Sequence, residues 1–157
     1  MFGRKSWKEK LLGSKGLPKV TQIPCDKTSK MGTGTFVVPA PTEVDSLMKK
    51  VPKGKLITIN QIRQTLAKKH KANTACPMTT GIFAWMSANA AEEAKTEGAK
   101  RVTPYWRTLK TGGEINPKYP GGIEHMQSLL ESEGHKVVRK GKKFLVEGYE
   151  DSLHNLD

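Results

Sequence analysis

The sequence predicts a mainly α-helical fold with small β elements, built around a helix-turn-helix. The first observation is an apolar stripe at Ile59, Ile62 and Leu66, which indicates one amphipathic helix. The second is a longer helical pattern that begins near Met78, after a short break, and ends at Thr96 before Gly98. Two helices joined by a short turn are typical of a helix-turn-helix.

Length and composition exclude several classes of protein. At 157 residues the chain has the length of one domain. Apolar residues make up 36% and occur only in short runs, whereas a membrane span needs roughly 20 in succession. Cys25 and Cys76 have neither a metal-binding spacing nor the pattern of a disulfide framework. No signal-like apolar stretch opens the chain. We therefore expect a cytoplasmic monomer without membrane attachment, bound metal or cofactor.

The positive charge is distributed unevenly. Residues 1–71 hold 16 Lys and Arg against 4 acids, and residues 72–157 hold 11 of each, so the net charge of +12 lies entirely in the first part. Such asymmetry predicts a polyanionic partner, with nucleic acid ahead of anionic lipid. A general solubilising bias is the alternative explanation.

The chain divides into a basic N-terminal arm at 1–34 and a domain at 35–157. Within the arm, Ser6 and Glu9 have the spacing of a capping box and predict a short helix over 7–12. The rest of the arm is rich in Lys, Ser, Thr, Gly and Pro, which favours an extended segment that is mobile unless it docks. The domain then opens with a predicted strand at 35–38.

Two further capping patterns follow. Thr42 is the predicted N-cap of a helix whose apolar residues Val44, Leu47, Met48 and Val51 share one face. Thr58 and Gln61 have capping-box spacing at the start of the first helix of the helix-turn-helix.

The long helix after Pro77 has two distinct faces. Met78, Ile82, Trp85 and Met86 share one face, which we interpret as the buried one. The neighbouring face carries only small residues: Thr79, Thr80, Gly81, Ala84, Ser87 and Ala88. Small residues let a backbone approach closely, so this face suits either another helix or a nucleic-acid groove.

The C-terminal third predicts a helix and a basic hairpin. Gly121 and Gly122 begin the helix and Gly134 ends it. The hairpin at 135–146 has a turn of Arg, Lys, Gly and Lys at 139–143. In a winged helix, a hairpin of this kind touches the DNA backbone.

The segment 101–122, RVTPYWRTLKTGGEINPKYPGG, combines prolines, glycines and aromatic residues between two helical patterns. Such segments frequently frame a site, because Pro and Gly hold unusual backbone angles and aromatic rings offer flat surfaces. The alternative is a loop whose Tyr105 and Trp106 anchor it in the core.

With these elements placed, residues 42–138 resemble the DNA-binding domain of the alkylguanine-DNA alkyltransferases and their non-catalytic alkyltransferase-like relatives. The resemblance rests on Pro104 with Arg107, on the loop from Gly113 through Tyr119 to the double glycine, and on Leu129-Leu130 with Glu133-Gly134-His135. It implies a winged helix-turn-helix that enters the DNA minor groove and flips a nucleotide into a pocket.

The chain departs from the family at the chemical centre. Tyr105 stands at the position of the acceptor cysteine, and Trp106 at that of the activating histidine. A phenol with an ordinary pKa near 10 and no imidazole beside it is a poor alkyl acceptor, so we expect no catalytic residue. Thr80 lies near the position of the inserted arginine, and Ile59 at that of the phosphate-pressing tyrosine. Glu133 keeps the acid but loses its histidine partner.

Two sets of candidate site residues follow. We expect a base-binding pocket formed by Tyr105, Trp106, Arg107 and Tyr119, since aromatic rings stack on bases. The candidates for DNA contact lie on the helix-turn-helix and the hairpin: Thr58, Asn60, Arg63, Thr79, Thr80, Ser87, Arg139 and Lys140.

The leading hypothesis is a non-enzymatic protein of the alkyltransferase-like type that binds duplex DNA in the minor groove, senses alkylated or flipped bases and hands them to repair proteins. A second hypothesis is an RNA- or protein-interaction module on a reused winged-helix fold. A third is alkyl transfer or other chemistry at Cys76, which lies in the turn before the long helix, or within the rebuilt pocket.

Overall fold

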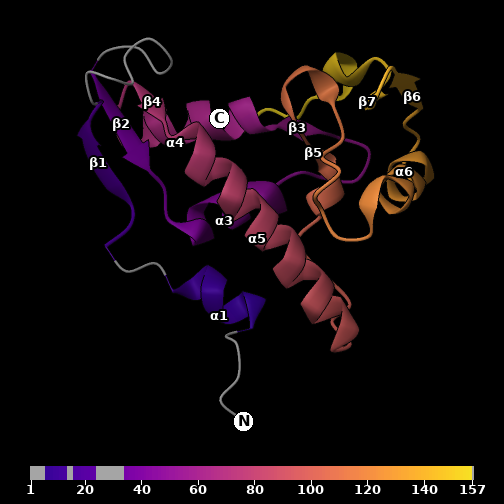
Figure 1. Cartoon of the computed structure of the whole chain (residues 1–157), viewed down its shortest axis with the longest axis horizontal. Coiled ribbons are helices and arrows are strands. Elements are labelled where there is room, and N and C mark those ends of the chain that lie inside the picture. Colours follow the sequence, from indigo (N-terminus) through magenta and orange to yellow (C-terminus); the bar gives the residue numbers. More distant parts are fainter. Residues whose placement is uncertain (1–5, 14–15, 24–33, 157) are drawn as a thin grey trace.

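The computed structural model describes residues 6–13, 16–23 and 34–156, most of them in helices and short strands (Figure 1). The helices are α1 (Trp7–Leu12), α3 (Pro41–Lys49), α4 (Ile59–Lys69), α5 (Pro77–Thr96) and α6 (Gly122–Ser132). The strands are β1 (Lys19–Gln22), β2 (Thr35–Val38), β3 (Ile57–Thr58), β4 (Thr74–Ala75), β5 (Thr108–Leu109), β6 (Val137–Lys140) and β7 (Lys143–Val146). The predicted class, mainly α with small β elements, is confirmed.

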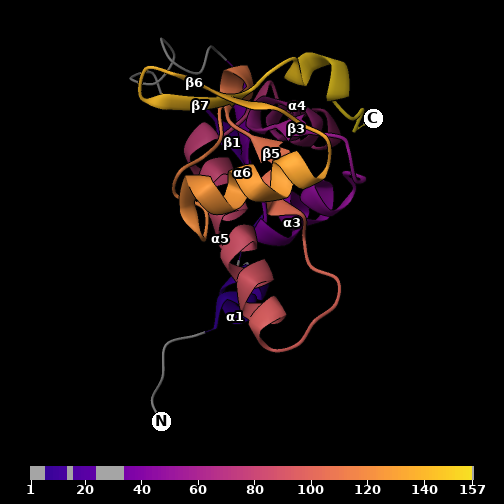
Figure 2. The same cartoon turned by 90° about the vertical axis from the view of Figure 1, so that its right-hand side faces the viewer.

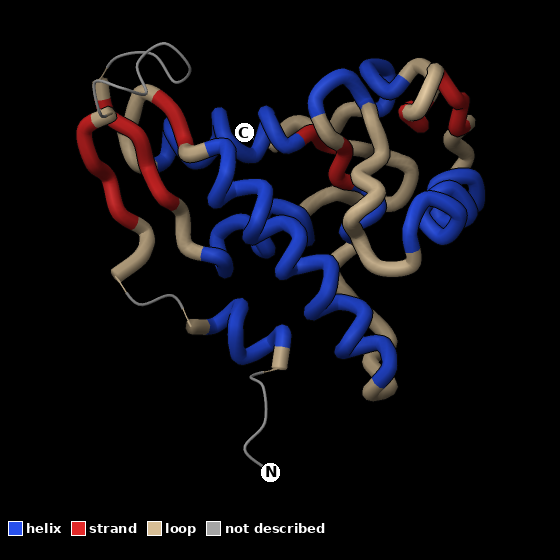
Figure 3. Tube along the Cα trace, in the orientation of Figure 1, coloured by secondary structure: helices blue, strands red, loops and turns tan. Residues whose placement is uncertain are grey.

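The strands form three small sheets (Figure 3). In the first, β2 pairs antiparallel with β1 and parallel with β4. In the second, β3 and β5 are parallel. The third is the predicted hairpin of β6 and β7. The C-terminal segment returns to the second sheet, because Leu56 donates to Ser152 O at 2.8 Å and accepts from His154 N at 2.7 Å.

Helix α5 lies between the sheets. Figure 1 shows it running diagonally in front of α3, with the three-stranded sheet on one side and the β6–β7 hairpin and α6 on the other. In the perpendicular view of Figure 2, α6 crosses in front of α5 and the hairpin projects beyond it. The helix is therefore the structural axis to which both halves of the chain attach.

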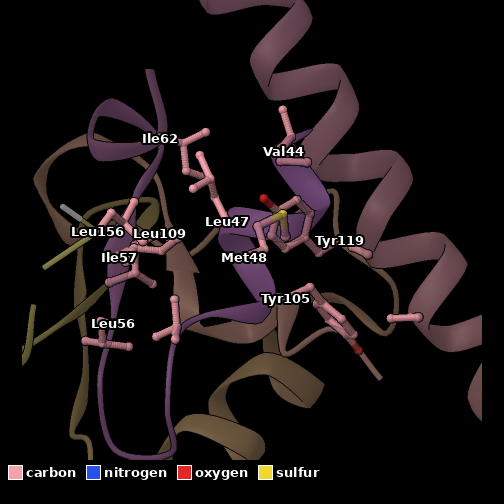
Figure 4. Close-up of a cluster of buried hydrophobic side chains, with 14 of the residues drawn as sticks. Val44, Leu47, Met48, Leu56, Ile57, Ile62, Tyr105, Leu109, Tyr119 and Leu156 are labelled. Carbon is pink, nitrogen blue, oxygen red and sulfur yellow. The ribbon is translucent and has the colours of Figure 1, made fainter. Parts of the chain in front are cut away.

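The core gathers apolar side chains from α3, β3, α4 and the segment after α5 (Figure 4). Val44, Met48 and Ile62 are fully buried, as the helical stripes predict, and Ile57 of β3 is fully buried beside them. The ring of Tyr105 is fully buried among them and meets Tyr119 edge to face, with ring centres 6.0 Å apart. The 101–122 segment is thus part of the core as well as a loop.

The start of α3 differs from the prediction. The sequence predicts Thr42 as the N-cap, but Ala40 occupies that position and Pro41 is the first helical residue. Proline suits the first turn because its φ is fixed near the helical value and it has no N–H to satisfy. The carboxylate of Glu43 accepts from Ala40 N at 3.0 Å, which is the half of a capping box that the third helical residue supplies.

The other two capping predictions are confirmed, because in each the N-cap hydroxyl accepts from the backbone N–H three residues later. Ser6 accepts from Glu9 N at 3.1 Å. The box at α4 is complete: Thr58 N donates to Gln61 Oε1 at 2.9 Å, and Gln61 N donates to Thr58 Oγ1 at 3.3 Å.

Two pieces of the N-terminal segment pack on the rest of the chain. Strand β1 pairs with β2, and α1 packs on α5. The first turn of α1 receives an acceptor from α5, since Trp7 N and Lys8 N donate to the carboxylate of Glu93 at 3.1 and 3.3 Å. The middle of the predicted arm, 24–33, lies outside the described residues.

The buried face of α5 is the opposite of the one predicted. The sequence predicts Met78 and Ile82 in the core, but their side chains are 72% and 46% exposed, and Trp85 and Met86 are only half-buried. The face of small residues is buried instead, at Thr80, Ala84, Ser87, Ala88 and Ala91. Small side chains allow α3 to pack close to α5, which leaves no room for the large residues on that side.

One polar cluster explains this packing. Asp45 of α3 is buried, and its Oδ1 accepts from Ser87 Oγ and from Thr103 Oγ1, each at 2.7 Å. Lys49 pairs with Oδ2 at 3.0 Å from the solvent side. A buried carboxylate requires such donors, so Ser87 must face α3.

No helix in the described part of the chain is both long enough and apolar enough to cross a membrane.

Candidate nucleic-acid interface

A groove of about 420 Å³ lies between α5 and the loop that precedes α6. The loop side is formed by Lys110 and the turn at 116–118, and the helix side by residues of the first three turns of α5. The lining residues are Met78, Gly81, Ile82, Trp85, Lys110, Asn116, Pro117 and Lys118. The groove is therefore apolar along the helix and polar along the loop.

Trp85 joins the two walls. Its indole Nε1 donates to Lys118 O at 3.1 Å, which ties the loop to the helix. On its other side, Trp7 of α1 packs against it edge to face, with ring centres 4.8 Å apart and planes at 85°. Trp85 is thus held by hydrogen bonding and by aromatic packing, so the groove is formed before a ligand arrives.

Glycines fix the ends of the loop. Gly113 has φ +83°, and an added Cβ would lie 2.4 Å from the ring of Tyr149. Gly121, also at φ +83°, caps α6, and a Cβ there would lie 2.6 Å from Cβ of His125. Positive φ and such close approach favour glycine at both positions. The predicted role of the glycines in shaping this segment is confirmed.

The charge along the groove is positive. Among the described residues that line it, two are lysines and none is acidic. Lys110 lies 4.0 Å from Glu114, at the limit of an ion pair, and about half of its side chain is exposed. An apolar strip bordered by cations suits a partner with an anionic exterior and an apolar interior.

The expected base-binding pocket does not take the predicted form. Tyr105 and Tyr119 are 0% and 3% exposed, so neither ring offers a face on which a base could stack. Tyr105 Oη donates to Glu92 Oε1 at 2.5 Å. Burial, followed by the hydrogen bond to Glu92 and its negative charge, raises the pKa of Tyr105 far above its ordinary value. Burial likewise raises the pKa of Tyr119. Both rings are core supports.

Trp106 and Arg107 are held by one carboxylate. Trp106 Nε1 donates to Glu133 Oε2 at 2.9 Å, and Arg107 binds both oxygens of Glu133, at 2.9 and 2.7 Å. Arg107 Nη1 also donates to Val51 O at 2.7 Å. Burial alone would raise the pKa of Glu133, but these hydrogen bonds and the Arg107 charge outweigh it and leave the pKa below its ordinary value. The four predicted pocket residues therefore hold the 101–122 segment against the core and α6.

Several predicted DNA contacts on the helix-turn-helix point inward. Thr58 caps α4, Thr80 Oγ1 donates to Cys76 O at 2.6 Å, and Ser87 donates to Asp45. All three are buried, so none is available to DNA. Their hydroxyls make hydrogen bonds at helix starts or in the core. The sequence pattern alone does not distinguish such buried hydroxyls from exposed ones.

The remaining candidates differ in position. Arg63 is half-buried and clamps the turn between α4 and α5, donating to Ala75 O, Asn60 Oδ1 and Thr74 Oγ1 at 3.0 to 3.2 Å. Thr79 is half-buried, and no hydrogen-bond partner is present for its hydroxyl within the described residues. Arg63, held by Asn60, therefore fixes the turn between α4 and α5.

The hairpin tip is basic and exposed, as predicted. Arg139 and Lys140 are exposed, and the Arg139 guanidinium lies 5.9 Å from the centre of the Phe144 ring while Nε donates to Gly141 O at 2.9 Å. Lys142 and Lys143 flank the same turn and are exposed. This tip is a second positive surface.

Cys76 is a free, half-buried thiol at the N-cap of α5. Within the described ranges, no three His, Cys, Asp or Glu side chains gather closely enough to hold a metal ion.

Reasoning from the sequence missed the groove residues on α5 and the two lysines opposite. One signal was present: Thr80, Ala84, Ser87, Ala88 and Ala91 also recur at helical spacing, and a stripe of small residues is itself a packing surface. Asp45, within the apolar stripe of α3, additionally required hydroxyl donors from a neighbouring element.

Comparison with protein-family models and with curated proteins gives no match. Among solved structures, the chain is similar to S. pombe Atl1 in complex with damaged DNA containing O6-carboxymethylguanine, at 16% identity and a TM-score of 0.50. It is also similar to S. pombe ATL in complex with DNA, at 16% identity and a TM-score of 0.51. Each match covers 73% of this chain and 93% of the other. The chain therefore has the alkyltransferase-type fold that residues 42–138 predict.

Proposed function

We propose that this chain is a non-catalytic DNA-binding protein of the alkyltransferase-like type. The observation that carries the proposal is the fold, which it shares with two structures that each hold DNA. In this proposal, α5 and the 110–118 loop face the minor groove of duplex DNA, and the basic tip of the β6–β7 hairpin lies along the phosphate backbone.

Charge supports this orientation. Lys110 and Lys118 border the groove, and Arg139 and Lys140 are exposed on the hairpin. Contacts between such side chains and phosphates release counterions, so the affinity must fall as salt concentration rises.

The state of Tyr105 supports the non-catalytic part of the proposal. Its hydroxyl is turned to Glu92 and its ring is enclosed, so the phenol is neither ionised at neutral pH nor in reach of a substrate. The alternative hypothesis is alkyl transfer to a thiol, and Cys76 is the free thiol in the described part of the chain. Mass spectrometry after incubation with duplex containing an alkylated guanine tests it. We expect an unchanged protein mass, and an added alkyl mass on Cys76 would establish an enzyme.

The proposal extends to lesion sensing. The groove offers an apolar wall at Ile82 and Trp85 and the apolar ring of Pro117, which suit an extruded base that carries an added alkyl group. Such a complex would present the damaged site to repair proteins.

The test is binding to two duplexes of identical sequence, one with an O6-alkylguanine and one with guanine, across a salt series. We expect tighter binding to the alkylated duplex and a decline of both affinities with salt. Equal affinities would remove the sensing role and leave general DNA binding. Binding to neither duplex at any salt concentration would remove the proposed function.

The exposed apolar side chains of α5 favour one other candidate function, a protein-interaction module, since such patches frequently mark protein interfaces. A stoichiometric protein partner, captured on the wild-type chain but not on a chain altered at Ile82, would support it. A single-stranded RNA that competes with duplex DNA at equal affinity would favour the RNA-binding version.

A further inference from the structure

Among the large apolar side chains exposed on the described part of the chain, that of Met78 has the highest exposed fraction. It is the second residue of α5, and its side chain is 72% exposed. Ile82 follows one turn later on the same face and is 46% exposed. Both side chains line the groove, so they form a short apolar ridge along its edge.

The fold does not account for this ridge. The packing of α5 on α3 uses the opposite face, where Ala84, Ser87 and Ala88 are buried. Neither Met78 nor Ile82 belongs to the core or to the apolar residues packed against it. A pair of large apolar side chains that the core does not use indicates contact with a partner.

The surroundings of the ridge favour DNA as that partner. Lys110 and Lys118 stand across the groove, and the positive end of the α5 dipole lies beside Met78. A duplex matches both features, because phosphates form its exterior and stacked bases its interior. Proteins that bind the minor groove insert Met, Ile, Leu or Phe side chains between base steps and kink the duplex.

The neighbours of Met78 permit close approach. Gly81 has no side chain, and a Cβ added there would meet nothing within 4 Å, so the surface beside the ridge is open. Met is also unbranched at Cβ and flexible, which lets its thioether adapt to a narrow gap between bases.

We propose that Met78, supported by Ile82, is an apolar wedge that enters the base stack of bound duplex and kinks it. This inference rests on the proposed function and deepens it by assigning the deforming residue. No bond is made or broken, because the wedge separates a base step by van der Waals contact alone.

The test uses the full chain and a duplex that carries 2-aminopurine at the central step, with a donor and an acceptor dye at its ends. For the wild type we expect a rise in 2-aminopurine emission and a shortened end-to-end distance. For the double variant Met78→Ala, Ile82→Ala we expect weaker binding and loss of both signals, because both side chains line the groove. The salt slope should stay the same, because the variant removes no cation that binds a phosphate. Met78→Gln, which keeps the length of the side chain, should lose most of the emission rise.

Leu12→Ala is the matched control, because Leu12 is 61% exposed on α1 and does not line the groove. It should retain both signals. The wedge is overturned if wild-type binding leaves the emission and the distance unchanged, or if the double variant distorts the duplex as the wild type does. Absence of salt-dependent binding by the wild type would instead overturn the proposed function, and the wedge with it.

Discussion

Arg107 and Glu133 form a two-point ion pair, with Nε donating to Oε1 at 2.9 Å and Nη2 to Oε2 at 2.7 Å. Glu133 lies at the C-terminal cap of α6, and Arg107 ends the helical turn that begins at Tyr105. The pair therefore ties the turn at 105–107 to the end of α6. Trp106 donates to the same carboxylate, so Glu133 holds both side chains of this turn.

Substitution Arg107→Ala should destabilise the chain strongly. It removes one partner of an ion pair whose side chains are 13% and 6% exposed, and an uncompensated buried charge typically costs about 3–5 kcal/mol. Urea unfolding measures the loss. Arg139→Ala, at an exposed arginine, is the control and should change the free energy of unfolding by less than about 0.5 kcal/mol. Equal effects of the two substitutions would show that the pair does not stabilise the loop.

Acid should weaken the fold through Glu133. Its pKa in the folded chain lies below the ordinary value of 4.5, so its contribution to stability is complete above that pH. The contribution is lost as the pH falls through the folded pKa, because the unfolded state binds the proton first. Unfolding free energies between pH 6 and pH 3 test this. Glu133→Gln should be less stable at pH 6 and should decline less steeply than the wild type, whereas parallel declines would contradict the assignment.

Ser87→Ala should be costly although it removes a single oxygen. The hydroxyl donates to the buried carboxylate of Asp45, and hydrogen bonds to charged groups contribute about 1.5–3 kcal/mol. Ser128 of α6 is exposed, so Ser128→Ala provides the same chemical change without the buried partner. Thermal unfolding should separate the two variants by several degrees. If Ser87→Ala proves as stable as Ser128→Ala, the buried cluster does not set the orientation of α5.

Trp7→Ala should loosen the groove at a distance. Trp7 packs edge to face on Trp85, and aromatic pairs of this kind contribute about 0.5–1.5 kcal/mol beyond area burial. Hydrogen exchange at the indole N–H of Trp85 reports on its bond to Lys118 O and should become faster in the variant. Leu12→Ala, on the same helix but exposed, should leave the exchange rate unchanged. An unchanged rate in Trp7→Ala would mean that α1 does not support the groove.

Much of the fold is predictable because local signals agree with packing. The box of Thr58 and Gln61, the stripe of α4 and the hairpin all appear where the sequence predicts them. Capping groups and helical stripes are short-range features, so a pattern within ten residues is sufficient to identify them.

The candidate site is less predictable because it depends on which face of α5 is buried. Large apolar residues usually mark the core, and Met78 and Ile82 mislead for that reason. The decisive partner, Asp45, lies 42 positions from Ser87, and no local pattern connects them. The same limit applies to Tyr105 and Tyr119, whose aromatic character suits a stacking platform as well as a core.

We propose that the groove face of α5 and the 110–118 loop together bind DNA. The most direct measurement compares the salt dependence of duplex binding between two double variants. The first is Lys110→Gln with Lys118→Gln, and the second is Lys95→Gln with Lys100→Gln. The second pair removes the same charge from exposed lysines at and beyond the C-terminal end of α5. Removing one lysine that binds a phosphate should reduce the salt slope by about 1, so we predict a reduction of about 2 for the first variant and none for the second. Equal slopes for the two variants would contradict the claim.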